Sequence, residues 1–365
     1  MIASTDSPRT DFAPARGFLD VGIAVLAFVL VCAGLNALLP FPEIDVVSPK
    51  LRYFRQHQDD FDTVFIGSSR IRHQISPAIF DETMREAGLP TRTFNFGVNA
   101  MVPPESIYVL ERLLANKPRH LRWVFIELDE LYTKRVPEME NTHRSLYWRD
   151  WKRTWLVIRA ILDAGPEENG FALLRRTADL LLPGLGKSEA RDLLFFHVEL
   201  FAKNSTNIGR KTDLSRWISQ FWKRKALSQE VASGAGYVPL NNKMSAAQAA
   251  VYETELESAM THGGFRFLSA STERAYRQLA EEVKKAGAIP IFLVPPLSMQ
   301  VELGFRPEPG IAGTVLSFNN ARAYQQLYRN EMRIDGGHLN SAAAEEFTRL
   351  VAEEFSRLRR ENRIQ

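Results

Sequence analysis

The chain has a single cysteine, Cys32, which lies inside an apolar run. One thiol excludes an intrachain disulfide and a zinc site built from several thiolates. The chain also lacks an excess of either charge, since 46 Lys and Arg oppose 43 Asp and Glu. This balance excludes a polycation that coats nucleic acid, so no nucleic-acid partner is expected. A phosphate-binding glycine loop and a dinucleotide fingerprint are both missing from the sequence.

Metal-ligand spacing is another absence. Six of the seven histidines stand apart from one another without the short repeats that bind zinc: His57, His73, His120, His143, His197 and His262. Surface, cap or core positions explain such isolated histidines. No metal and no other cofactor is therefore expected.

One segment departs from the ordinary globular composition of 45% hydrophobic and 24% charged residues. The run 21–39 carries no charge, and Asn36 is its one strongly polar residue. It is long enough to span a bilayer as a helix, and it lacks the polar face of a buried core helix. A cleaved signal peptide would need small residues at the cut, which Leu35-Asn36-Ala37 matches poorly. The run predicts an uncleaved membrane anchor, with a topology left open by basic residues on both sides.

The remainder predicts strands alternating with helices. The expected strands end at polar or glycine residues, and the expected helices have apolar residues at helical spacing. The strands are 63–66, 93–96, 123–128 and 288–294, and the helices include 77–87, 104–115, 273–286 and 342–349. This alternation favours a three-layer α/β/α sandwich around a parallel sheet. The predicted organisation is a tail (1–20), an anchor (21–39), a connector (40–60), the α/β/α domain (61–355) and a C-terminal tail (356–365).

The stretch 135–262 is far longer than a usual crossover, so it is expected to be a helical insertion. It contains five tryptophans, Trp148, Trp151, Trp155, Trp217 and Trp222, and a basic stretch over 203–225. Two interpretations remain open. The insertion is either a solvated helical layer with some aromatic residues in its core, or a surface for anionic headgroups or an acidic polymer.

Two short motifs carry the candidate chemistry. Gly67-Ser68-Ser69 follows the first strand, at the edge where open α/β sheets bind ligands. Asp335 and His338 lie three residues apart near the C-terminus, before a helix. A serine nucleophile needs a base within hydrogen-bond reach and an acid that orients that base. Each motif alone also fits a capped turn, whereas the two together predict a Ser-His-Asp triad.

The order of these motifs resembles the SGNH/GDSL hydrolase superfamily. The resemblance implies that Ser69 is the nucleophile, His338 the base and Asp335 the orienting acid, with Ser68 in place of the family's aspartate. The second block resembles residues 95–100, where Ala100 replaces the glycine that supplies an oxyanion-hole amide. Its backbone N–H would still act beside that of Ser69.

The third block departs from the family, since Glu127-Leu128-Asp129-Glu130 replaces a motif that contains asparagine. An ionised carboxylate cannot donate to an oxyanion. Asn99 is the candidate for the missing side-chain donor, with a simple turn residue as the alternative. Arg70, His73 and Asp129 are candidate substrate-binding residues.

A membrane anchor combined with Gly-Ser-Ser is similar to the envelope branch of this superfamily, whose members assist alginate O-acetylation or teichoic-acid D-alanylation. That resemblance implies a serine esterase or O-acyltransferase on a cell-envelope glycan, working beside a membrane-bound O-acyltransferase. The body would face the periplasm or the cell exterior. Two alternatives remain: a catalytically inactive scaffold that binds polysaccharide or the acyltransferase, and an intracellular lipid esterase tethered to the membrane.

Overall fold

The computed structural model describes residues 14–38, 41, 43–135, 142–163, 189–205, 231–307 and 313–364. A five-stranded parallel sheet lies at its centre, with the strand order β2-β1-β3-β5-β7. The strands are β1 (Thr63–Gly67), β2 (Thr93–Gly97), β3 (Trp123–Glu127), β5 (Ile289–Val294) and β7 (Thr314–Ser317). The predicted α/β class with a parallel sheet is confirmed, and β7 is an edge strand that the sequence analysis missed.

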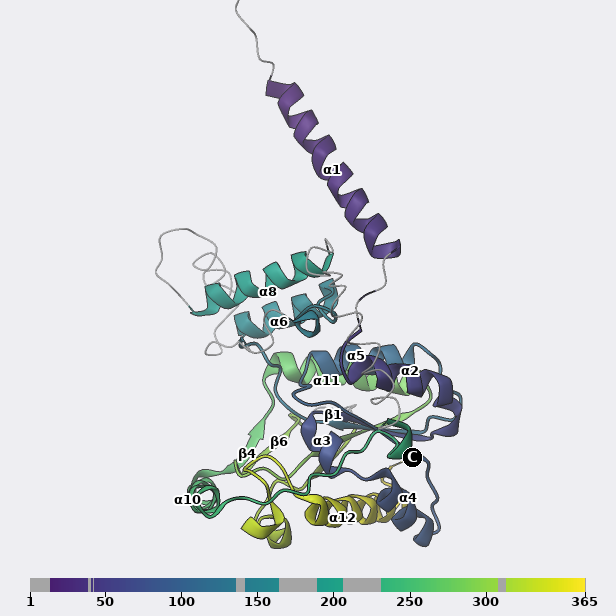
Figure 1. The fold of residues 1–365 in the computed structure, drawn as a ribbon, viewed down its shortest axis with the longest axis vertical. Coiled ribbons are helices and arrows are strands. Elements are labelled where there is room, and N and C mark those ends of the chain that lie inside the picture. Colours follow the sequence, from purple (N-terminus) through teal and green to yellow (C-terminus); the bar gives the residue numbers. More distant parts are fainter. Residues whose placement is uncertain are drawn as a thin grey trace, which may run out of the picture.

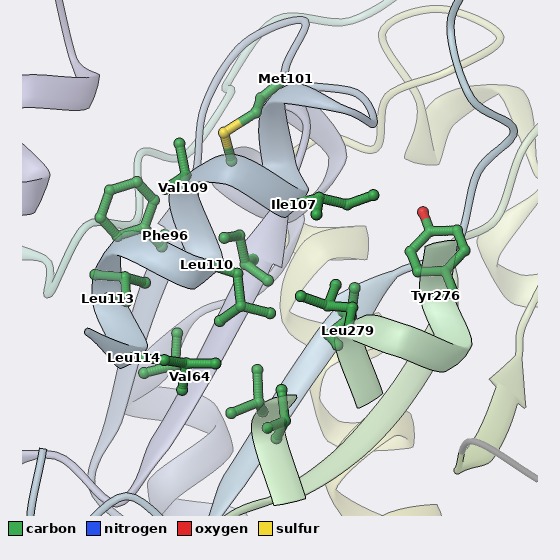
Figure 2. Packing of buried hydrophobic residues seen from close by; sticks show 14 of the residues in the cluster. Val64, Phe96, Met101, Ile107, Val109, Leu110, Leu113, Leu114, Tyr276 and Leu279 are labelled. Atoms are coloured by element: carbon green, nitrogen blue, oxygen red, sulfur yellow. The ribbon is translucent and has the colours of Figure 1, made fainter. Parts of the chain in front are cut away.

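Helices cover both faces of this sheet (Figure 1). One face carries α2 (Val47–His57), α5 (Glu105–Leu114) and α11 (Ala270–Lys285), and the other carries α3 (Ser69–Gln74), α4 (Pro77–Glu86) and α12 (Ser341–Arg360). Alternate residues of a strand point to opposite faces, so Val64 and Ile66 pack with the first set and Phe65 with the second. Figure 2 shows the first of these cores, between α5, α11 and the sheet.

Further elements lie outside these layers. The helices α6 (Trp151–Asp163), α8 (Glu189–Ser205) and α10 (Ala246–His262) fall within the predicted insertion. The strands β4 (Gly264–Phe267) and β6 (Val301–Gly304) form a second, two-stranded parallel sheet that was not predicted. Short 3₁₀ helices are η1 (Gln58–Asp60), η2 (His143–Ser145), η3 (Gln325–Leu327) and η4 (Asn330–Met332). Trp217, Trp222 and the basic stretch beyond residue 205 lie outside the described residues.

The N-terminal helix α1 (Pro14–Leu38) has 25 residues. It exposes a series of large apolar side chains: Leu19, Val21, Ile23, Val25, Leu26, Phe28, Val29, Leu30 and Val31. Within the described ranges, no helix combines the length and the apolar content that crossing a bilayer demands. The predicted anchor over 21–39 is thus not found there, and its last residue, Leu39, lies outside those ranges with residues 1–13.

A buried lysine joins α2 to the sheet. The Lys50 side chain is almost completely inaccessible, and its Nζ donates to the carbonyls of Asn95 (2.9 Å), Gly97 (2.7 Å) and Gly236 (2.6 Å). Three acceptors match the three N–H bonds of an ammonium group, which satisfies a charge that burial would otherwise destabilise. The contact also holds the segment around Gly236 against the end of β2.

The pH dependence of stability can be predicted from His197 in α8, a completely buried residue whose ring contacts Arg149 and the Thr133 carbonyl. Burial and the neighbouring Arg149 charge lower the pKa of His197 to about 4. His197 therefore binds a proton near pH 6.5 in the unfolded chain, but only near pH 4 in the folded chain. Stability should be full above pH 6.5 and fall by about 3 kcal/mol as the pH drops to 4.

Urea unfolding of wild type and His197→Gln at pH 7 and pH 4 checks this expectation. The variant should lose less stability on acidification than wild type by about that amount. His262→Gln, at an exposed histidine of α10, is the matched control and should keep the wild-type dependence. Equal acid sensitivity of wild type and His197→Gln would contradict the prediction.

Candidate active site

The site lies where the order of the sheet reverses direction. From β1 the chain passes to β2 on one side and later to β3 on the other, so the carboxyl ends of β1 and β3 border a topological switch point. Open α/β sheets bind ligands at such points. Ser68 follows β1 and caps α3, because its Oγ accepts from the Arg70 N–H at 3.2 Å. Ser69 is then the first residue of α3, half-buried at this edge.

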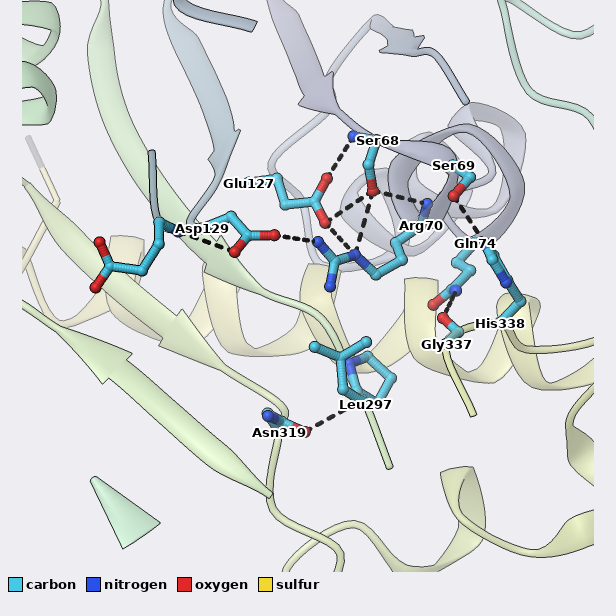
Figure 3. Close-up of polar contacts among 12 residues, drawn as sticks. Ser68, Ser69, Arg70, Gln74, Glu127, Asp129, Leu297, Asn319, Gly337 and His338 are labelled. Atoms are coloured by element: carbon cyan, nitrogen blue, oxygen red, sulfur yellow. Dashed lines mark hydrogen bonds and ion pairs between the residues drawn. The ribbon is translucent and has the colours of Figure 1, made fainter. Parts of the chain in front are cut away.

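Ser69 and His338 are 269 positions apart in the chain and meet at this edge (Figure 3). The distance from Ser69 Oγ to His338 Nε2 is 2.7 Å. His338 Nδ1 lies 2.9 Å from both carboxylate oxygens of Asp335. A carboxylate accepts only, so Nδ1 carries a hydrogen, and Nε2 is the ring nitrogen that faces the serine hydroxyl. The three predicted triad residues thus have the connectivity of a nucleophile, a base and an orienting acid.

Asp335 is fixed within its own turn. Its Oδ1 also accepts from the backbone N–H groups of Gly337 (2.7 Å) and His338 (2.8 Å). Burial alone would raise the pKa of Asp335, but its hydrogen bonds with His338 and these amides, together with the His338 charge, lower it. The carboxyl group therefore stays ionised near neutral pH and holds the imidazole in one tautomer.

Arg333 supports this turn from beneath. Its side chain is completely buried, and its guanidinium donates to the carbonyls of Asp335 (3.2 Å), Gly336 (2.9 Å), Pro296 (3.2 Å) and Leu327 (3.1 Å). The rings of Tyr252 and Tyr328 lie 5.5 and 5.3 Å from its guanidinium carbon. From the other half of the chain, Gln74 Nε2 in α3 donates to the Gly337 carbonyl at 3.0 Å. These contacts hold the turn that contains His338 against the helix that begins at Ser69.

A buried carboxylate supports the turn that contains Ser69. Glu127 ends β3 with 3% of its side chain exposed, and it accepts from the Ser68 N–H, from Ser68 Oγ (3.0 Å) and from Arg70 Nε (Figure 3). A Cβ at Gly67 would lie 2.3 Å from Glu127 Oε2, so this approach requires glycine at that position. The carboxylate therefore fixes the backbone from Gly67 to Arg70 around Ser69.

Arg70 and Asp129, predicted as substrate-binding residues, belong to the same network. Arg70 bridges Glu127 and Asp129, with 2.6 Å between its terminal nitrogen and Asp129 Oδ2. Burial would lower the pKa of Arg70, but the charges of Glu127 and Asp129 raise it. The guanidinium is thus engaged by protein carboxylates, whereas Asp129 keeps about a third of its side chain exposed.

The predicted oxyanion-hole groups lie in the first turn of α3 and in the turn that follows β2. The Ser69 N–H stands in the first turn of α3, where amides lack an intrahelical acceptor. Ala100 has φ = 56°, a left-handed conformation that glycine adopts more easily. The Asn99 side chain contacts His73 Nε2 at 2.9 Å, and His73 Nδ1 contacts the Val238 carbonyl at 2.7 Å.

His73 lies beside His338, with its ring centroid 6.5 Å from that of His338 in an edge-to-face arrangement. Burial, which outweighs the hydrogen bond to Val238, lowers the pKa of His73, and both ring nitrogens are engaged, one by the Val238 carbonyl and one by Asn99. His73 thus orients Asn99 rather than presenting a free cation to a substrate.

A small hollow of about 60 Å³ adjoins Ala100. Trp148 and Phe196, both within the predicted insertion, line it together with Pro104 and Tyr132. Space for only a few atoms beside an oxyanion-hole residue suits a short substituent. The insertion therefore contributes walls next to the candidate site.

Three supporting residues were not singled out for these roles: Arg333, Gln74 and Glu127. Glu127 gave a weak signal as a charged residue at the end of an apolar strand, whereas Arg333 and Gln74 gave none, because their roles depend on contacts with distant carbonyls. In the described part of the chain, no three His, Cys, Asp or Glu residues are grouped so as to hold a metal ion. Neither the known protein-family models nor the curated proteins include a match to this chain.

Removing the buried carboxylate should destabilise the fold strongly. Glu127→Ala leaves the Arg70 charge and the Ser68 N–H without their buried acceptor, so the free energy of unfolding should fall by about 3 kcal/mol or more. Asp129→Asn is the control, because Asp129 is part-exposed and its loss should cost about 1 kcal/mol or less. Urea denaturation of the three proteins measures the difference. A Glu127→Ala protein as stable as Asp129→Asn would show that the network does not hold the turn.

Proposed function

We propose that this protein is a serine esterase or O-acyltransferase of the SGNH/GDSL type that acts on acyl esters of a cell-envelope glycan. The observation that carries the proposal is the unbroken hydrogen-bonded series from Ser69 Oγ through His338 to Asp335. It stands at the carboxyl edge of a parallel sheet, and its order along the chain resembles that of the superfamily. A serine hydroxyl, an imidazole and a carboxylate in this order are sufficient for acyl transfer without a metal.

In the first half-reaction, the Ser69 hydroxyl passes its proton to His338 Nε2 while Oγ bonds to the ester carbonyl carbon. The Ser69 and Ala100 amides stabilise the negative charge on the carbonyl oxygen. His338 then gives the proton to the departing alkoxide, which leaves an acyl group on Ser69. Asp335 stabilises the imidazolium throughout and does not itself take up the proton.

In the second half-reaction, an incoming hydroxyl gives its proton to His338 and its oxygen bonds to the acyl carbon. Water as that hydroxyl completes hydrolysis, and a sugar hydroxyl completes transfer. As the bond between Ser69 Oγ and the acyl carbon breaks, His338 returns its proton to Oγ, and the product leaves as a carboxylic acid or as a new ester.

An inactive scaffold that binds polysaccharide or a membrane-bound O-acyltransferase is the second candidate. The observation that favours it is the end of β3, where Glu127 and Asp129 are carboxylates bonded to Arg70. The superfamily's asparagine would donate a side-chain N–H to the oxyanion from this block, and these carboxylates cannot. The first experiment below separates the two candidates.

Labelling by a fluorophosphonate probe should depend on Ser69. We expect wild type to label and to hydrolyse p-nitrophenyl acetate, and Ser69→Ala to lose labelling and at least about 10³-fold of the activity. Ser258→Ala, on an exposed part of α10, is the control and should behave as wild type. Mass spectrometry of the labelled peptide identifies the modified residue. A folded wild type that neither labels nor turns over ester would favour the scaffold.

We further propose that the protein is held at a membrane through α1, with its body in the periplasm or outside the cell. The exposed apolar side chains from Leu19 to Val31 support this, since apolar surface of that extent needs a cover. A membrane-bound O-acyltransferase is the proposed partner, because it would supply the acyl group from the opposite side of the membrane.

Deletion of residues 1–38 should release the protein from membranes. Full-length protein is expected to resist extraction with alkaline carbonate, and the shortened chain to appear in the soluble fraction. A phosphatase reporter fused to the C-terminus should be active only if the body is translocated. Carbonate-soluble full-length protein would contradict attachment, and an inactive reporter on a stable fusion would favour the tethered intracellular esterase.

A further inference from the structure

A hollow of about 400 Å³ lies away from Ser69, between α6 and α11 beside α5. In Figure 1, α6 lies outside the α5 and α11 layer, on the side away from α12. Its floor is apolar and is formed by Ile107, Leu156 and Leu279. None of its lining residues belongs to the candidate active site, so the mechanism leaves this groove unused.

Two indoles form one rim of the groove. Trp151 and Trp155 are 63% and 47% exposed, their ring centroids are 6.0 Å apart, and their planes lie within 17° of parallel. Large aromatic side chains that remain this exposed next to a hollow are unusual unless they contact a ligand. The electron-rich face of an indole packs well against the C–H groups on one face of a sugar ring.

Arg159 extends the same row. Positions 151, 155 and 159 are four residues apart on α6, so they follow one side of the helix with a rise of about 6 Å from each to the next. This interval is comparable to the length of one sugar unit. The row therefore matches a chain of sugars lying along α6 better than it matches a single small molecule.

The charges in the groove distinguish Arg159 from the other cations. Lys152 pairs with Glu111 and Glu282 (2.9 Å each), Arg153 pairs with Glu111 and Asp150, and Arg274 pairs with Asp163. Arg159 has no acidic partner among the residues that the structure describes. A guanidinium without a protein carboxylate at the end of an aromatic row is suited to bind a carboxylate of the ligand in a bidentate manner.

We infer that this groove binds an acidic sugar chain, with sugar rings on Trp151 and Trp155 and a sugar carboxylate on Arg159. The biological role of such binding rests on the proposed function, because it would hold the glycan while another of its residues reaches Ser69. Binding itself does not require turnover. The concave form favours a discrete ligand over a bilayer, whose flat surface would meet the rim and leave the floor unfilled.

The test is isothermal titration calorimetry of the full-length protein in detergent micelles. The acidic probe is a hexamer of galacturonic acid, and the neutral probe is cellohexaose. We expect the acidic hexamer to bind and the neutral one to bind at least about tenfold more weakly. Arg159→Gln should lower the affinity for the acidic hexamer by about tenfold and leave the affinity for the neutral hexamer unchanged. Trp155→Ala should lower the affinity for both hexamers, and Trp155→Phe should restore part of it.

Arg349→Gln, at an exposed arginine of α12 with its own acidic partners, is the matched control and should bind as wild type. Circular dichroism melts confirm that each variant is folded. Ser69→Ala should bind the hexamer normally, so an inactive wild type that still binds would refute only the proposed function. The inference is overturned if an active wild type fails to bind the acidic hexamer. It is also overturned if Trp155→Ala and Arg159→Gln both bind the hexamer with wild-type affinity. Binding of the same variants to phosphatidylglycerol vesicles is measured in parallel. If the variants lose vesicle binding but keep hexamer binding, the groove is a membrane contact and the inference is overturned.

Discussion

Glu127 ends a buried strand with its carboxylate almost completely removed from water. A charge in that position is stable only when donors surround it, and within the described ranges its donors come from Ser68 and Arg70. The requirement to satisfy one carboxylate at the end of β3 therefore fixes the turn that follows β1. Ser69 lies within that turn, so its position relative to the sheet depends on an ion pair in which it takes no part.

His338 is held near Ser69 by a second set of buried contacts. The Arg333 guanidinium donates hydrogen bonds to four carbonyls in and around the turn that contains Asp335, and Gln74 joins this turn to α3. The α12 helix adds a further link, because Thr348 Oγ1 donates to the Gln74 carbonyl at 3.0 Å. Backbone carbonyls are the acceptors in all these contacts. The hydrogen bond between Ser69 and His338 is thus held by the main chain on both sides, as a preorganised site requires.

The helices outside the α5 and α11 layer contribute walls rather than reacting groups. Trp148 and Phe196 line the hollow beside Ala100, and Trp151 and Trp155 line the larger groove along α6. Aromatic side chains in both places offer apolar contact area with little conformational entropy to lose. Many α/β proteins place their reacting groups at the edge of the sheet and their ligand contacts on added helices. Loops and insertions can change without disturbing the sheet.

Local sequence was sufficient for much of the fold. Apolar runs predicted β1, β2, β3 and β5, because buried parallel strands need such runs on both faces. Local sequence did not predict β7, in which only Leu316 is fully buried, or the small β4 and β6 sheet with its exposed β4. Short strands of this kind depend on the neighbour to which they pair, and a single segment does not contain that information.

The sequence by itself determined which groups could react, since a strand-end serine and an Asp-x-x-His turn were recognisable from residue types and spacing. Only the tertiary structure decided that Ser69 Oγ and His338 Nε2 lie 2.7 Å apart and that Arg70 is engaged by Glu127 and Asp129. The physical reason is that a side chain's chemistry is local, whereas its partners are set by which distant backbones pack together. Burial, which decides where a charge needs a partner, exists only once the chain has folded.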